Sequence, residues 1–355
     1  MGNIKGIDDS LMDNLAIKTF SKQHLTRRII LLAFALLAVA LISFMLGRYF
    51  ELPDKVFAEV VAKIMDYSPF DPKLAKALFN IRLPRIIVVV LVGMGLSVAG
   101  AAYQGMFKNP LVSPDLLGAS AGASFGACLA LLLNMRNEFI QLFAFITGLL
   151  AVGLVLLINK MVRGDALLGL ILGGILVGTL FTSGTSIIKL VADADDKLPA
   201  ITFWLMGSFA GVKQSDLLPV SIPMLVGFIM VLTQSWNLNA LSFGEAEAST
   251  LGVNIRLTRF LVIFGATLLT ASSIAVSGII GWIGLVVPHL TRAIVGPNYR
   301  VLLPTTMLTG AMFLLIVDNF ARLIYSVEIP IGLLTSILGV PFFIFIYRKN
   351  LRGWS

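Results

Sequence analysis

The chain has 355 residues, of which 57% are hydrophobic and 13% are charged, and its mean hydropathy is +0.93. Because a soluble domain is about half apolar and about a quarter charged, this composition excludes an ordinary soluble protein and predicts an integral membrane protein. The net charge of +8 does not indicate binding to nucleic acid. The single cysteine, Cys128, excludes an intrachain disulfide.

Long apolar runs predict one all-α transmembrane domain over residues 29–350, with about ten membrane-spanning helices. A spanning helix needs about 20 apolar residues, and the eighth run is short and broken by a proline. The predicted spans are 29–50, 82–106, 116–133, 139–158, 167–188, 217–233, 260–280, 282–295, 304–323 and 331–347.

A polar segment, residues 1–28, precedes the first span and is expected on the cytoplasmic side. Leu11 and Leu15 fall on one face of a possible helix, so this segment is either an interfacial helix or a loosely ordered tail. Between the first two spans, residues 51–80 carry mixed charges and three prolines, which predicts a loop and a short helix outside the membrane.

The second span is rich in small residues, which let membrane helices approach one another closely. These residues are Gly93, Gly95, Ser97 and Gly100. The segment 108–115 follows, where Pro110 and Pro114 predict a stiff break before the third span.

Basic residues set the expected topology, because Lys and Arg are enriched in cytoplasmic loops. With the N-terminus inside, the predicted cytoplasmic segments hold more than half of the 27 Lys and Arg residues and a minority of the 19 acids. This asymmetry predicts that both termini are cytoplasmic, with an even number of spans. It also places the polar loop 236–256 in the cytoplasm.

The loop 236–256 is a polar stretch between two apolar runs. Residues 245–251 suit a short helix, with Gly244 or Ser242 as its cap and Gly252 as its end. Glu245 and Glu247 lie in its first turn, where the helix dipole favours negative charge. The loop is either a docking site for a partner or an ordinary solvated connection.

Sequence motifs for catalysis are absent. The chain has no Gly-rich phosphate loop, no catalytic triad and no cluster with metal-ligand spacing, and His24 and His289 are far apart in the sequence. The protein is therefore predicted not to be an enzyme, to bind no cofactor or metal, and not to hydrolyse ATP by itself.

Seven segments in order carry a resemblance to a known family. They are RLPR (82–85), NPLVSPDLLG (109–118), GEAEASTLGV (244–253), GIIGWIGLVVPHLTR (278–292), DNFAR (318–322), EIPIG (328–332) and GVP (339–341). The chain resembles, from its first to its tenth span, the FecCD/BtuC-type permease subunits of type II ATP-binding cassette importers for iron-siderophores, haem and cobalamin.

The resemblance implies a ten-span subunit of the cytoplasmic (inner) membrane, in which spans 2–5 and 7–10 form an inverted repeat. It also implies a homodimer or a pseudo-dimer of such subunits, with the homodimer expected and the translocation path between the two subunits. Two ATPase subunits, which use ATP and Mg, would bind on the cytoplasmic side, and an extracytoplasmic substrate-binding protein would dock on the other side.

The resemblance also assigns roles to residues, beginning with the ATPase-coupling segment. Its members are Gly244, Glu245, Ala246, Glu247, Ala248, Leu251, Gly252 and Val253. Arg82, Arg85 and Arg322 would meet carboxylates of the binding protein, although anchoring at the membrane surface is an alternative for them. Asp318 precedes Arg322 by four residues and could orient it, whereas a role for Asp318 as an intramembrane ion site lacks a second buried acid.

Asn109 and Leu111 resemble the family's cytoplasmic gate, although a plain turn is an alternative for this loop. His289 is expected to pack at a helix break. The cargo is expected to be a metal chelate such as a ferric siderophore, haem or cobalamin, with molybdate or tungstate as the alternative, and to cross along a mostly apolar path. An ion-coupled secondary transporter is the rival interpretation, which requires acids near the membrane midplane.

Overall fold

The computed structural model describes residues 5–47, 53–161, 166–325 and 327–351, and in these ranges the chain is helical, without a strand. Seven helices are long and apolar enough to cross a membrane, and three shorter apolar helices, Ala119–Leu132, Ile283–Val295 and Ile331–Pro341, accompany them. Each predicted span coincides with one of these helices. The all-α class is confirmed, while the number of membrane crossings and their direction stay predictions.

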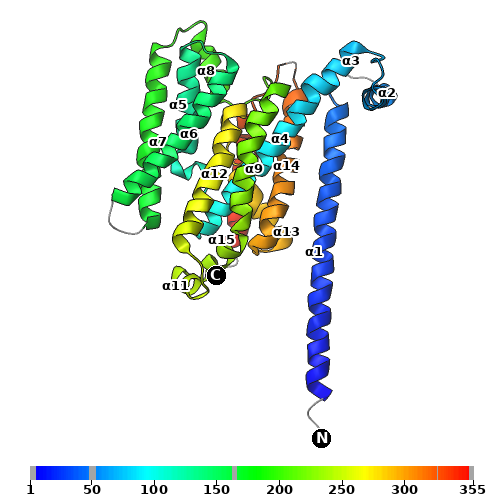
Figure 1. Cartoon of the computed structure of the whole chain (residues 1–355), viewed down its shortest axis with the longest axis vertical. Helices are drawn as coiled ribbons and strands as arrows, with labels where there is room; N and C mark the ends of the chain where they lie inside the picture. Colours follow the sequence, from blue (N-terminus) through cyan, green and yellow to red (C-terminus); the bar gives the residue numbers. More distant parts are fainter. Residues whose placement is uncertain (1–4, 48–52, 162–165, 326, 352–355) are drawn as a thin grey trace.

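The first helix, α1 (Lys5–Met45), runs without a break through the predicted polar segment into the first span. Its apolar part, Leu25–Met45, is little buried, and α1 lies along one side of the bundle with its N-terminal end projecting away from the rest (Figure 1). The predicted end of this span, residues 48–50, lies outside the described residues.

Between the first two spans the chain forms short helices rather than a loop with one helix. These are α2 (Pro53–Ile64), α3 (Pro72–Lys76) and a π-helical turn, η1 (Ala77–Arg82), which leads directly into α4 (Leu83–Met106). Asp71 caps α3 by accepting hydrogen bonds from the Lys73 and Leu74 amides at 2.9 and 3.2 Å. Pro84 has no N–H to donate, and a widened turn is a common way to absorb such a break in the helical ladder.

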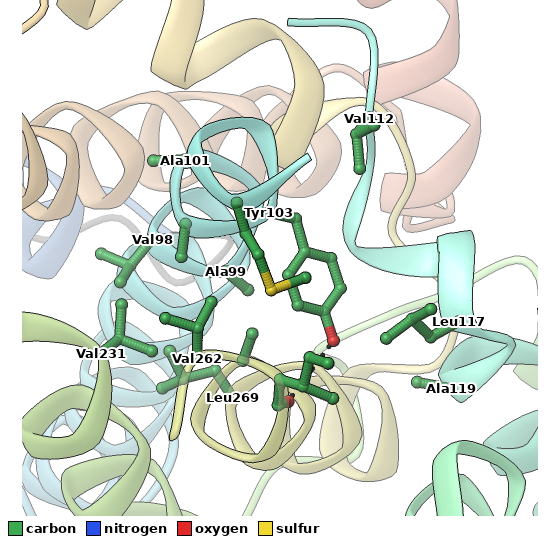
Figure 2. Packing of buried hydrophobic residues seen from close by; sticks show 14 of the residues in the cluster. Val98, Ala99, Ala101, Tyr103, Val112, Leu117, Ala119, Val231, Val262 and Leu269 are labelled. Carbon is green, nitrogen blue, oxygen red and sulfur yellow. Dashed lines mark hydrogen bonds between the residues drawn. The ribbon is translucent and has the colours of Figure 1, made fainter. Parts of the chain in front are cut away.

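Helix α4 is the centre of the fold and packs most extensively against four other helices. These neighbours are α9 (Leu217–Thr233), α12 (Ile255–Ser277), α13 (Ile283–Val295) and α14 (Tyr299–Leu323). The predicted small residues make these contacts close, since a Cβ on Gly93 would lie 2.5 Å from the Gly310 carbonyl oxygen. Figure 2 shows Tyr103 of α4 in the apolar core, where its hydroxyl donates to the Ile263 carbonyl at 3.4 Å.

A second group of helices lies on the opposite side of this centre from α1 (Figure 1). It consists of α5 (Ala119–Leu132), α6 (Asn137–Met161), α7 (Ala166–Val191) and α8 (Lys197–Leu205). Helix α5 packs against both α6 and α7. A short 3-10 turn, η2 (Pro114–Leu117), introduces α5.

The two ends of the bundle carry different extramembrane elements. Helices α2, α3 and α8 lie at one end, and α11 (Glu245–Thr250) and the C-terminus lie at the other (Figure 1). Helix α10 (Ser235–Phe243) connects α9 to α11, and α15 (Ile331–Leu351) completes the bundle. We refer to the ends as outer and cytoplasmic, following the topology that the basic residues predict.

Candidate functional site

A charge network occupies the outer end of α4 and α14. We call Arg85, Asp318, Arg322 and Glu328 the outer charge network. Arg85 Nη2 donates to Asp318 Oδ1 at 2.8 Å, and Arg85 Nη1 donates to Glu328 Oε1 at 2.9 Å. The side chains of Arg85 and Asp318 are 7% and 0% exposed, and Glu328 is the more accessible carboxylate at 22%.

Arg322 joins this network to α1. Its Nε lies 3.3 Å from Asp318 Oδ2, so the ion pair that the four-residue spacing predicts is present. Its Nη2 also donates to the Ser43 hydroxyl at 2.9 Å. Arg322 therefore links α14 to the end of α1, and it is buried.

Arg82 also binds the end of α1. Its Nη1 donates to the carbonyl oxygens of Phe44 and Met45, both at 3.0 Å. A cation bonded to the last carbonyls of a helix is favoured by the helix dipole. The structure thus gathers Arg82, Arg85 and Arg322 at the outer end, but each is mostly buried and has partners within the chain.

The predicted gate loop is a rigid turn at the cytoplasmic end of α4. Lys108 has a left-handed backbone (φ 50°), and the Asn109 side chain accepts a hydrogen bond from the Leu111 amide at 2.9 Å. Leu111 is 53% exposed, while Val112 is buried in the core. Pro114 packs against Gly284 of α13, where a Cβ on Gly284 would lie 2.4 Å from the proline ring.

The predicted coupling loop folds as two short helices, α10 and α11, with a tight turn at each end of α11. Gly244 (φ 137°) and Gly252 (φ 81°) both have positive φ values, which L-residues rarely adopt. Ala248 and Val253 are buried in the small core of this loop. Glu245 forms an ion pair with Arg259 at the start of α12.

The surface of the coupling loop combines acidic and apolar groups. Glu247 and Ala246 are exposed, and two large apolar side chains flank α11, Phe243 at 76% and Leu251 at 56% exposed. The loop is thus compact. Ala248 and Val253 are buried in its small core, whereas Phe243 and Leu251 are exposed on its surface.

A cleft of about 840 Å³ lies between α5 and α7, and a set of polar side chains accompanies its mostly apolar lining. Hydroxyl groups dominate its polar lining, together with one lysine and one acid, Asp115, which accepts a hydrogen bond from Ser120. The side chains on the α7 face include Thr179, Thr182, Ser183, Ser186 and Lys189. The sequence signal for this face is the three- and four-residue spacing of polar residues along an otherwise apolar span.

Comparison with known proteins identifies the family. The model of the FecCD transport family matches residues 35–349. The chain is 40% identical over 322 residues to the molybdate import system permease protein MolB of Haemophilus influenzae, covering 91% of this chain and 95% of that protein. It is 39% identical over 280 residues to the hemin transport system permease protein HmuU of Yersinia pestis, covering 76% and 83%.

The chain belongs to the FecCD transport family. A solved structure described as an inward-facing conformation of a putative metal-chelate type ABC transporter superposes with a TM-score of 0.82 at 38% identity, covering 91% of this chain and 99% of that one. These relatives are transport permeases rather than enzymes. As a FecCD permease with several apolar helices, the chain is a multi-pass protein of the cytoplasmic membrane.

The outer charge network generates a prediction about stability. Replacing Asp318 by Asn leaves Arg85 and Arg322 buried without their shared carboxylate, and loss of one partner of a buried ion pair costs about 3–5 kcal/mol. We expect a clearly lower thermal unfolding midpoint for Asp318→Asn in detergent. Glu328→Gln is the matched control, with a smaller shift because Glu328 is partly exposed. Equal shifts in the two variants would show that Asp318 does not hold the network together.

Proposed function

We propose that this FecCD permease is the membrane subunit of an ATP-driven importer. It acts as a homodimer, with two ATPase subunits on its cytoplasmic side and a substrate-binding protein on its outer side. It performs no covalent chemistry itself. It alternates between outward-open and inward-open conformations, and ATP binding and hydrolysis in the partner shift their populations.

The coupling loop is the observation that carries this proposal. A solvated connection has no need of a core of its own or of two turns with positive φ, whereas this loop has both. Phe243 and Leu251 expose apolar surface on an extramembrane element, which is typical of a protein contact site. We infer that α11 and its flanking apolar side chains dock on the ATPase, with Glu247 at the rim.

The charges in the membrane domain argue against the rival, an ion-coupled transporter. Asp318 is buried at the outer end of α14, and it is ion-paired with both Arg85 and Arg322. Because two arginines already neutralise the charge of this carboxylate, it is a poor ligand for a transported cation. Its role is to hold helices together.

The cargo has two candidates, a metal chelate and an oxyanion. Both kinds of substrate occur in the names of the relatives, haemin for one and molybdate for another. We favour the oxyanion, because the relative that is 40% identical is named for molybdate import. The cleft between α5 and α7 adds a set of hydroxyl groups and Lys189 beside its apolar lining, with Asp115 as the one acid of that lining.

Reconstitution tests the function and the coupling loop together. In proteoliposomes with the ATPase and the loaded binding protein, we expect ATP-dependent uptake of molybdate in preference to haemin or a ferric siderophore. Gly252→Trp should abolish uptake and weaken ATPase co-purification. Gly252→Asn is the matched control, because asparagine tolerates positive φ and open space surrounds Gly252. Uptake and ATPase retention at the parent level in the Trp variant would contradict the coupling role.

We also propose that Arg82, Arg85 and Arg322 receive carboxylates of the substrate-binding protein. Because these arginines are mostly buried and already have partners within the chain, we expect them to act through long-range attraction, which is screened over about 8–10 Å at 0.1–0.15 M salt and affects mainly the association rate. Arg82→Gln should slow association at low salt, with the difference shrinking at high salt. Lys63→Gln, an exposed cation on α2, is the control. Identical association rates for both variants at every salt concentration would remove Arg82 from the docking surface.

The gate proposal rests on the rigid turn at Asn109 and the exposed Leu111 beside it. In a symmetric dimer the two loops would face each other across the path. Leu111→Cys, in a Cys128→Ala background, should crosslink between the two copies without nucleotide, and the yield should change with an ATP analogue and binding protein. Ile64→Cys, exposed on α2, is the control and should not crosslink. No crosslink through Leu111→Cys in any state would place the loop away from the dimer axis.

A further inference from the structure

A basic pocket of about 750 Å³ opens at the cytoplasmic end of the bundle, outside the cleft between α5 and α7. It lies where α4 and α13 end and where α10 and α14 begin. Its chemistry is set by six residues, Gln104, Lys108, Trp236, Asn239, His289 and Arg292. Two of these side chains are permanent cations, and the lining contains no aspartate or glutamate.

The fold positions these cations without giving them a counter-charge. Gln104 donates through Nε2 to the carbonyls of Gly284 and Leu285 at 3.5 and 3.4 Å, which turns its Oε1 towards Arg292. Arg292 Nη2 donates to that oxygen at 3.3 Å. Among the residues that the structure describes, neither Arg292 nor Lys108 forms a salt bridge with a carboxylate. The pocket therefore offers positive charge to an external anion.

The topology that the basic residues predict places the pocket at the cytoplasmic membrane surface, because its walls are the ends of the apolar helices α4, α13 and α14 together with α10 of the coupling loop. Trp236 is 48% exposed, and the Arg300 guanidinium lies 4.8 Å from its ring centroid. Tryptophan and arginine in this position are typical of the membrane–water interface. Helix α1, whose apolar part is little buried, reaches α13 near this region, where Arg28 donates to the Ile294 carbonyl at 2.7 Å.

We propose that the basic pocket binds a phosphate group, carried by the headgroup of an anionic phospholipid of the inner leaflet. Basic pockets between membrane helices on the cytoplasmic side suit such headgroups. Lys108 and Arg292 neutralise the phosphate, and Trp236 and Asn239 line the rest of the pocket. A freely diffusing phosphate offers the same charge but has no need of the interfacial position or of the neighbouring lipid-facing helix.

The bound lipid would connect the gate loop to the coupling loop, a consequence that rests on the proposed function. Asn109 of the gate loop and Trp236 of α10 both line the pocket. An occupant that contacts both restrains the gate loop relative to the coupling loop. Anionic lipid is then expected to raise ATP-dependent uptake, whereas lipid binding itself needs neither the ATPase nor the cargo.

Native mass spectrometry of the purified full-length permease tests the proposal. We expect the parent to retain phosphatidylglycerol or cardiolipin over phosphatidylcholine, and the double variant Lys108→Gln/Arg292→Gln to lose this preference by roughly tenfold. Lys160→Gln is the matched control, an exposed cation at the cytoplasmic end of α6 outside the pocket. If the double variant does not fold, Lys108→Gln alone, on an exposed side chain, should show part of the loss.

A second arm separates the two sources of phosphate. Delipidated permease is heated with phosphatidylglycerol micelles, with inorganic phosphate or with glycerol 3-phosphate, and the unfolding midpoint is measured. We expect stabilisation by the lipid alone, lost in the double variant. Equal retention of anionic lipid by the double variant and Lys160→Gln would overturn the proposal. Equal stabilisation by inorganic phosphate would overturn the lipid assignment. Neither result depends on whether the protein transports molybdate.

Discussion

The close approach of α4 to its neighbours is the contact on which the rest of the bundle depends. Within lipid, apolar surface gains little by leaving the surrounding hydrocarbon, so helices associate through tight packing of small residues. Gly100 shows how tight this contact is, since a Cβ there would lie 1.8 Å from the Gly284 carbonyl oxygen. Gly93 makes the same kind of contact with Gly310. These two contacts fix α13 and α14 against α4.

Helix α4 also connects the outer charge network to the basic pocket at the cytoplasmic end. Arg85, in the first turn of α4, belongs to the outer charge network, and Gln104, in its last turn, orients Arg292 in the basic pocket. At 1.5 Å per residue, these residues are roughly 29 Å apart, close to the hydrocarbon thickness of about 30 Å. A displacement of α4 as a rigid body therefore moves a group at each membrane surface.

Local features of this architecture could be predicted from the sequence, and its long-range pairings could not. Hydropathy located the helices, and spacing within one helix predicted the pair of Asp318 with Arg322. The stronger partner of Asp318 is Arg85, 233 residues earlier in the chain, and no periodicity connects positions so far apart. The hydroxyl face of α7 was not predicted, although its residues recur at helical spacing, and its position opposite α5 depends on the tertiary fold.

The cations at the two ends of the bundle differ in whether they pair with a carboxylate of the same chain, and this difference affects how a partner can dock. Outside, Arg85 and Arg322 have carboxylates of the same chain, whereas inside, Lys108 and Arg292 have none among the described residues. An inner leaflet rich in anionic lipid can supply the missing charge there. Outside, a docking carboxylate must compete with Glu328, the accessible member of the network, for Arg85. The gain would then be the difference between two similar ion pairs, so the proposed contact would contribute orientation and association rate more than affinity.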